Sequence, residues 1–451
     1  MTTTGTGSWR RLRLGTRGSR LALTQSGQVA EALMAAGGGG AAAAAGKASE
    51  GSGGLGIDLV TVRTDGDGDR TPLRQLGGVG VFAARLRHAL LDGEVDLVVH
   101  SFKDLPTQPV EGLEVICVPP REDPRDALCA RDGLTLADLP EGARVGTGSP
   151  RRAAQLLAAR PDLEVVDLRG NVPTRLARVR GLEVVGVGTD EPVAPSRADA
   201  AGDLDAVVLA LSGLRRLGLE HCASEVLDLE TMLPAPAQGA LAVEARADED
   251  SAELARAVAA LDDEPTRLAV TAERALMARL GAGCAAPVGA WAHLRGGGQE
   301  PREEHAEHGT GWNEEFGGND TAATRTRQGA GTGQDAGAAS GGPRPVVAAD
   351  RGDERGGTEP AGAAGPQGSE VSRRSPRVLV LRAVVTSLDG GQEVGCELST
   401  ELPEATGGPR TPGDTAAVRA AEALGVRAAE VLLEDGADQI VDLHANKPRR
   451  D

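Results

Sequence analysis

Residues 144–159 read RVGTGSPRRAAQLLAA, and this stretch decides the fold class. Arg144–Gly146 predicts a short strand, whereas Pro150–Ala159 predicts a helix because apolar residues recur there at three- and four-residue steps. Ser149 suits the N-cap position, and proline is favoured at the first helical position that follows it. A strand that leads directly into a helix is typical of parallel sheets covered by helices, so we expect an α/β fold.

The same alternation of strand and helix patterns extends in both directions from this stretch. Further strands are predicted at Leu12–Gly15, Ile57–Arg63, Val95–His100, Val165–Leu168 and Ala206–Ala210. Further helices are predicted at Ser19–Ala36, Val81–Leu91, Val172–Arg178 and Thr266–Leu280. Near the end of the chain, a strand at Val378–Thr386 and a helix at Asp414–Leu433 predict a small α+β domain with an insertion in a hairpin.

Three segments interrupt this order by their composition. Gly37–Gly54 and Val187–Gly202 are rich in small, polar or turn-forming residues, and both are interpreted as surface expansions of a loop between a helix and a strand. Gly296–Ser375 has almost no large apolar side chains and therefore cannot offset the entropy lost on ordering. We expect this longest segment to be disordered and assign it no function.

Composition excludes several classes of function. The 451 residues are 40% hydrophobic and 1% aromatic, with no tyrosine, and the formal net charge is −18. Few rings for base stacking and an acidic surface predict no nucleic-acid partner. The absence of a secretory leader or a run of about eighteen apolar residues predicts a cytoplasmic chain without a membrane partner. The five scattered cysteines form no CxxC pair, so neither a disulfide framework nor a metal site is expected.

Two helix starts combine a predicted N-cap with a pair of arginines. Thr147–Arg152 follows one strand, and Leu168–Arg175 repeats the arrangement after the next. Free N–H groups and guanidiniums at a helix start bind anions, and arginine binds carboxylates bidentately. Two such sites at strand ends predict a ligand with several carboxylates. The alternative is that these arginines form surface salt bridges with the acidic chain.

The segment His100–Pro106, HSFKDLP, brings a basic and an acidic side chain together just after a buried strand. Lys103 and Asp104 are candidates to line a site, because polar residues at such strand ends often do. The alternative is that the pair caps a loop, and His100 itself is expected to be a packed core histidine. Arg121–Asp126 is interpreted either as a hinge between domains or as a solvated charged loop.

Cys284 stands in a loop of small residues, Gly281–Pro287, after the predicted helix Thr266–Leu280. Small neighbours permit close approach by a bulky partner, and a thiolate there could form a covalent bond. Taken alone, the pattern fits a structural cysteine better.

Together these segments resemble the porphobilinogen deaminase family over Arg13–Arg246 and Thr266–Trp291. The family's motifs appear in its order as Thr16–Ser19 (TRGS), His100–Pro106 (HSFKDLP), Arg121–Asp126 (REDPRD), Leu168–Asn171 (LRGN), Pro236–Ala240 (PAQGA) and Gly283–Cys284 (GC). The resemblance implies two domains like those of type II periplasmic binding proteins around a cleft, followed by a small C-terminal α+β domain. The implied boundaries are 9–119 with 237–260, 124–233, and 264–295 with 376–446, leaving 296–375 as the insertion.

The resemblance also implies an activity and its residues. Cys284 would form a thioether to a dipyrromethane cofactor, on which four porphobilinogen molecules are condensed with loss of ammonia, and Asp104 would be the catalytic residue. The cofactor would be bound by Ser101, Lys103, Thr147, Ser149, Arg151, Arg152, Gly170 and Gln238. The substrate would be bound by Arg17, Ser19, Arg169, Asn171, Arg175 and Arg216. A monomer is expected, and no metal.

Departures from the family pattern leave two alternatives open. Gln75 and Val79 replace lysines that the family often carries in the glycine-rich segment Asp65–Phe82, and Gly148 stands where a serine is common. A degenerate homologue would fold without turnover, although the predicted catalytic residues are present. A non-catalytic binding protein for an organic anion would need the arginines but neither a reactive thiol nor Asp104.

Overall fold

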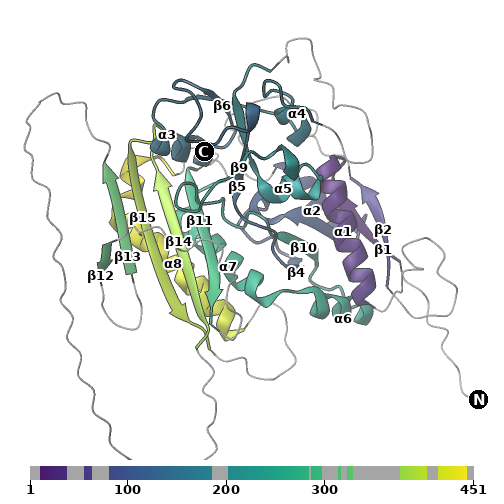
Figure 1. Ribbon diagram of the computed structural model, residues 1–451. Coiled ribbons are helices and arrows are strands. Elements are labelled where there is room, and N and C mark those ends of the chain that lie inside the picture. Colours follow the sequence, from purple (N-terminus) through teal and green to yellow (C-terminus); the bar gives the residue numbers. More distant parts are fainter. Residues whose placement is uncertain are drawn as a thin grey trace, which may run out of the picture.

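The computed structural model describes residues 11–37, 55–62, 81–184, 202–283, 286–296, 313–315, 322–328, 376–403 and 415–443. Three five-stranded sheets organise these residues, and helices pack against each of them (Figure 1). The α/β prediction is therefore confirmed. No helix in the described ranges is long and apolar enough to cross a bilayer.

The first sheet has the strand order β2-β1-β3-β10-β4. Its strands are β1 (Arg11–Thr16), β2 (Gly56–Thr61), β3 (Leu97–Ser101), β4 (Leu113–Cys117) and β10 (Leu241–Arg246). β1 runs parallel to β2 and β3, whereas β10 returns from far along the chain and lies antiparallel between β3 and β4. The accompanying helices are α1 (Arg20–Ala36), α2 (Val81–Leu91) and α6 (Ala252–Leu261).

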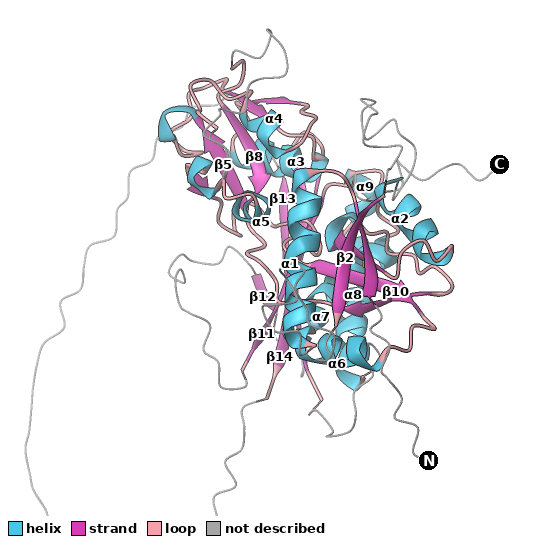
Figure 2. Cartoon of the chain, turned by 90° about the vertical axis from the view of Figure 1, so that its right-hand side faces the viewer, coloured by secondary structure: helices cyan, strands magenta, loops and turns pink. Residues whose placement is uncertain are grey.

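The second sheet has the strand order β7-β6-β8-β5-β9. Its strands are β5 (Asp126–Ala130), β6 (Arg144–Gly146), β7 (Glu164–Val166), β8 (Ala206–Ala210) and β9 (Glu225–Val226). Its helices are α3 (Pro150–Ala159), α4 (Val172–Leu176) and α5 (Leu211–Arg216), which Figure 2 shows grouped at one end of the molecule. In both sheets three parallel strands are followed by one antiparallel strand, as expected for type II periplasmic-binding-protein halves.

The third sheet has the strand order β11-β14-β15-β13-β12 and is antiparallel throughout. It comprises β11 (Val288–Arg295), β12 (Asn313–Glu315), β13 (Ala322–Gln328), β14 (Val378–Thr386) and β15 (Gln392–Glu401). The helices α7 (Glu264–Leu280) and α8 (Ala416–Glu434) share its core, and α9 (Ala437–Ile440) follows. α7 and α8 approach closely at Gly425, where a Cβ atom would lie 2.1 Å from the Ala272 carbonyl oxygen.

The expectation of disorder throughout Gly296–Ser375 is wrong for two pieces of that segment. β13 pairs with β15 along its whole length, and β12 pairs with β13. The sequence of β13, AATRTRQ, is polar, so it offered no apolar run, yet β15 has an open edge whose backbone groups a further strand can pair with. The hairpin prediction is confirmed, because β11 and β14 pair with each other on either side of the insertion.

Most predicted elements are present with boundaries shifted by a few residues. β3 begins at Leu97, two residues later than expected, and β7 ends at Val166. The strands β4, β5 and β10 and the helices α5 and α6 were not among the predicted elements. Residues 38–54, 63–80 and 185–201, which include Gln75 and Val79, lie outside the described residues.

Candidate functional site

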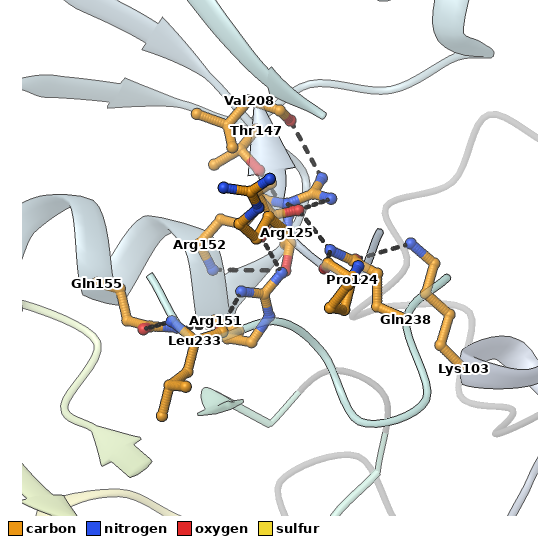
Figure 3. Close-up of polar contacts among 12 residues, drawn as sticks. Lys103, Pro124, Arg125, Thr147, Arg151, Arg152, Gln155, Val208, Leu233 and Gln238 are labelled. Carbon is orange, nitrogen blue, oxygen red and sulfur yellow. Dashed lines mark hydrogen bonds and ion pairs between the residues drawn. The ribbon is translucent and has the colours of Figure 1, made fainter. Parts of the chain in front are cut away.

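A buried carboxylate, Asp126, joins the two arginines of the first predicted anion site. Asp126 begins β5 and has no solvent exposure. Its Oδ2 accepts from Arg151 Nη2 at 2.7 Å, and its Oδ1 accepts from Arg152 Nη2 at 2.7 Å and Nε at 3.1 Å (Figure 3). Although burial alone would raise it, these two guanidiniums hold the pKa of Asp126 well below its usual range. Arg151 and Arg152 therefore form a buried ion cluster with Asp126 and not surface salt bridges.

Gln238 connects this cluster to the first sheet. Its Nε2 donates at 2.7 Å to both Asp126 Oδ1 and the Pro124 carbonyl, which leaves its Oε1 to accept from Lys103 Nζ at 3.1 Å (Figure 3). Gln238 itself is fully buried. The side chains of Lys103, from the first sheet, and of Arg151 and Arg152, from the second, are thereby held at one place.

Positive charge at this place exceeds the negative charge that the described residues supply. Burial, together with repulsion from Arg152, lowers the pKa of Lys103 to about 8. Burial, together with repulsion from Arg152 and Arg169, likewise lowers the pKa of Arg175 to about 10. We call Lys103, Arg151, Arg152, Arg169 and Arg175 the cationic cluster. Such mutual repulsion between neighbouring cations is what a bound polyanion would relieve.

Three predicted hydroxyl or amide ligands cap helices in this structure. Ser19 accepts from Ala22 N at 3.3 Å, Ser149 accepts from Arg152 N at 3.5 Å, and Asn171 accepts from Thr174 N at 2.9 Å. Thr147 is buried, and its Oγ1 accepts from Ser149 N at 3.2 Å. These bonds stabilise the first turns of α1, α3 and α4 and set where those helices begin.

Asp104 closes a single 3₁₀ turn, Phe102–Asp104, directly after β3. It is exposed, and among the described residues no hydrogen bond or ion pair restrains its carboxylate. Its charge nevertheless acts on both Lys103 and Arg175, so it lies within electrostatic range of both sheets' cations. An exposed carboxylate beside a cationic cluster can approach a bound molecule.

Polar contacts of His100 and Ser101, at the end of β3, hold the residues that precede this turn. Ser101 exchanges hydrogen bonds with Gln25 of α1 at 3.1 Å. His100 is 7% exposed and contacts Glu244 Oε2 at 3.0 Å, and Glu244 also accepts from Arg87. The prediction that His100 is a core histidine is confirmed.

The remaining predicted ligands lie in the loops and helix ends around the two sheets. Arg216 Nη2 donates to the Gly239 carbonyl at 2.6 Å, and burial lowers the pKa of Arg216. Gly170 has φ +112°, a conformation that favours glycine, and its carbonyl accepts from Arg175 Nε at 2.7 Å. Arg17 is half-buried just after β1. Cys284 lies outside the described residues, between Gly283 and Ala286 of the loop that joins α7 to β11.

The chain crosses between the first two sheets at residues 118–125, and a buried ion pair anchors this crossing. Arg121 donates to both oxygens of Glu273 on α7, at 2.7 and 3.1 Å, and Glu273 has no exposure. Glu273 also accepts from Ala292 N at 2.8 Å and from Ala237 N. The hinge interpretation of Arg121–Asp126 is favoured over a solvated loop, because Arg121 and Asp126 are held in buried ion pairs.

Sequence reasoning missed Asp126, Glu273, Gln25 and Arg274 as residues that shape the site. The available signals were the place of Glu273 on an otherwise apolar face of its helix and that of Asp126 at the start of the apolar run Ala127–Ala130, since a charge in such a place implies a buried partner. Such a signal identifies a charge in need of a partner but not which partner it has.

The site gathers cations from two α/β sheets of matching strand order, with the exposed carboxylate of Asp104 beside them, an arrangement suited to an anionic ligand. The chain belongs to the porphobilinogen deaminase family. A family model described as "Porphobilinogen deaminase, dipyromethane cofactor binding domain" matches residues 12–254, and the one described as "Porphobilinogen deaminase, C-terminal domain" matches residues 267–299.

Named relatives agree with this assignment. The porphobilinogen deaminase of Micrococcus luteus is 56% identical over 299 residues, which cover 63% of this chain and 74% of that protein. That of Cutibacterium acnes is 43% identical over 440 residues, covering 97% and 99% of the two chains. A solved periplasmic solute binding protein from Roseobacter denitrificans, 10% identical, covers 56% of this chain and 78% of its own with a TM-score of 0.28, too low to support an inference.

Proposed function

We propose that this chain is a hydroxymethylbilane synthase. It condenses four porphobilinogen molecules head to tail with release of ammonia, on a covalently bound dipyrromethane primer, and then releases hydroxymethylbilane by hydrolysis. The observation that carries this is the unrestrained Asp104 carboxylate beside a cationic cluster drawn from two sheets, in a chain of the porphobilinogen deaminase family. Release of ammonia from porphobilinogen tests it directly, because a non-catalytic binding protein would bind the pyrrole without releasing any.

The residues present suit a dipyrromethane, which carries two carboxylates on each pyrrole. The cationic cluster has an excess of positive charge, and Arg151 Nε is buried without a hydrogen-bond partner among the described residues. When bound, the dipyrromethane would supply the free pyrrole carbon to which the first porphobilinogen is joined. Lys103, Arg151 and Arg152 would hold its carboxylates, and Gln238 would hold Lys103 in place, with Ser101, Thr147, Ser149 and Gly170 shaping the surrounding backbone.

Attachment at Cys284 is supported by the state of the other thiols. In the described part of the chain the cysteines are Cys117, Cys129, Cys222 and Cys396, and all four are buried. Burial raises the pKa of Cys117, Cys129 and Cys396 to about 12, and it raises the pKa of Cys222 as well. A protonated, buried thiol is a poor nucleophile, so none of the four competes for a thioether bond.

Asp104 would act at the nitrogen of the substrate pyrrole. Loss of ammonia from porphobilinogen leaves a cationic azafulvene, and a nearby carboxylate stabilises the positive charge as it develops. The same carboxylate can accept the pyrrole-carbon proton after the new carbon–carbon bond has formed. The substrate's acetate and propionate would pair with arginines of the surrounding loops, namely Arg17, Arg169, Arg175 and Arg216, aided by Ser19 and Asn171.

The protein without its cofactor should acquire the dipyrromethane more slowly as the pH rises through about 8. Lys103 binds a cofactor carboxylate only when protonated, and its pKa in the cofactor-free protein is lowered to about 8, so the cation is present below that pH and lost above it. The loss should appear as a slower gain of the cofactor mass on incubation with porphobilinogen. The Lys103→Arg variant should have a flatter profile above pH 8, because arginine keeps its charge. An identical alkaline fall in wild type and Lys103→Arg would contradict this assignment.

We also propose the domain organisation and cellular setting implied by the family. The three sheets support three domains, 9–119 with 237–260, 124–233, and 264–295 with 376–446. β12 and β13, within 296–375, extend the third of these. The protein would be a cytoplasmic monomer.

A further inference from the structure

Arg274, on α7, contacts the turn that carries Asp104. Its Nη1 donates to the carbonyl oxygens of Leu105 at 2.7 Å and Phe102 at 3.3 Å, and its Nη2 donates to that of Pro106 at 2.8 Å. The guanidinium carbon also lies 4.5 Å from the centre of the Phe102 ring. One side chain from the third sheet's helix thus satisfies three carbonyls on either side of Asp104.

These contacts restrain the carbonyl groups on both sides of Asp104. The start of the turn is held separately, because Phe102 N donates to the Ala240 carbonyl at 3.0 Å and the Phe102 and Leu105 side chains are buried. Phe102–Asp104 is a single 3₁₀ turn, closed by one hydrogen bond from Leu105 N to Phe102 O at 3.2 Å. Carbonyls that bond to a guanidinium are held by charge-assisted hydrogen bonds, and the stacked ring adds a cation–π contact. Arg274 therefore helps to set the direction of the Asp104 side chain, because it restrains the carbonyls on both sides of that residue.

The helix α7, which carries Arg274, is held in place by buried contacts. The preceding residue, Glu273, is buried and holds Arg121, Ala237 N and Ala292 N. Six residues after Arg274, α7 ends at Leu280, and Gly281 caps it in a left-handed conformation with φ 63°. The loop that begins there leads to Cys284. One helix therefore joins the Asp104 turn to the loop of the cysteine.

We propose that Arg274 is a positioning residue for Asp104: it sets the carboxylate against the molecule bound through Cys284 without itself touching a reacting atom. This inference rests on the proposed catalytic role of Asp104. Because Arg274 acts on placement and not on carboxylate binding, its loss affects the chemical step more than substrate affinity.

The Arg274→Met variant tests this, because methionine retains the packing of the arginine stem but not its three hydrogen bonds. We expect kcat to fall about tenfold to a hundredfold with KM for porphobilinogen changed less than about threefold, as for a misplaced catalytic group. The cofactor mass should be retained. Arg274→Lys, which keeps the charge and can still reach a carbonyl, should recover part of kcat and provides the test if the methionine variant does not fold. Unchanged kcat in Arg274→Met would overturn the proposal, as would an equal loss in both variants.

Arg279→Met is the matched control on the same helix. Arg279 is exposed and pairs with exposed Glu430 at 3.2 Å, so kcat should be unchanged.

A double variant distinguishes a role in placing Asp104 from a general loss of structure. Asp104→Glu already displaces the carboxylate, so adding Arg274→Met should slow it by much less than the same change slows wild type. Fully multiplicative losses would show that Arg274 acts independently of Asp104. The proposed role of Asp104 fails separately, if Asp104→Ala turns over normally.

Discussion

The Asp104→Ala variant should keep its fold and its covalent cofactor but lose nearly all turnover. Removing one preorganised charge that stabilises a transition state typically costs about 10²–10³ in kcat, and loss of proton transfer adds to this. Stability should hardly change, because Asp104 is exposed and its carboxylate has no hydrogen bond or ion pair within the described ranges. The measurement is kcat for porphobilinogen consumption together with a thermal unfolding curve of the same sample.

Asp104→Asn distinguishes charge from shape at this position. The amide has nearly the volume of the carboxylate but cannot stabilise a cation or accept a proton, so its kcat should be as low as that of Asp104→Ala. Turnover of either variant within about threefold of wild type, well short of the usual loss for such a group, would remove Asp104 from the mechanism.

The Asp126→Ala variant should be strongly destabilised. Removing this carboxylate leaves Arg151 and Arg152 as buried cations, with side chains 3% and 7% exposed. Breaking a buried ion pair by deleting one partner costs about 3–5 kcal/mol of unfolding free energy. Gln238 would also lose an acceptor, so Lys103 would be less firmly held and the protein should acquire its cofactor more slowly. Denaturant unfolding measures the first effect, and the rate at which the cofactor mass appears on incubation with porphobilinogen measures the second.

Asp58→Ala is the comparison for a pair of the same chemistry at the surface. Asp58 pairs with Arg11, and their side chains are 49% and 53% exposed. Exposed pairs contribute about 0–1 kcal/mol, so this variant should unfold almost as wild type does. Equal small losses in the two variants would mean that Asp126 is not the centre of the cluster.

The sequence predicts much of the fold because local patterns reflect local forces. The helix α3 begins where Ser149 and Pro150 indicate, since capping depends on neighbouring residues alone. β10 could not be placed in this way, because its position between β3 and β4 depends on pairing with strands more than 120 residues earlier. β13 was missed because its pairing with β15 and β12 uses backbone groups and requires no apolar run in the sequence.

The sequence indicates which cationic residues are candidates for the site, but it does not indicate which residues they contact. Helix-start motifs identified Arg151, Arg152 and Arg175 as anion-binding candidates, and the structure brings their charges together. It also shows Arg151 and Arg152 bonded to Asp126, 25 and 26 residues away, a pairing that no spacing rule predicts. Likewise, nothing local in α7 indicates that Arg274 contacts the turn around Asp104, because Arg274 and Phe102 are 172 residues apart in the sequence.

The intact mass of the purified protein, compared with that of Cys284→Ala, tests the central claim most directly. A chain that carries a dipyrromethane on Cys284 should exceed its sequence mass by two condensed pyrrole units, and the variant should not. A wild-type chain isolated without the cofactor should acquire that mass on incubation with porphobilinogen. Wild-type protein that stays at its sequence mass even after such incubation, or a variant that gains the same mass, would contradict the account.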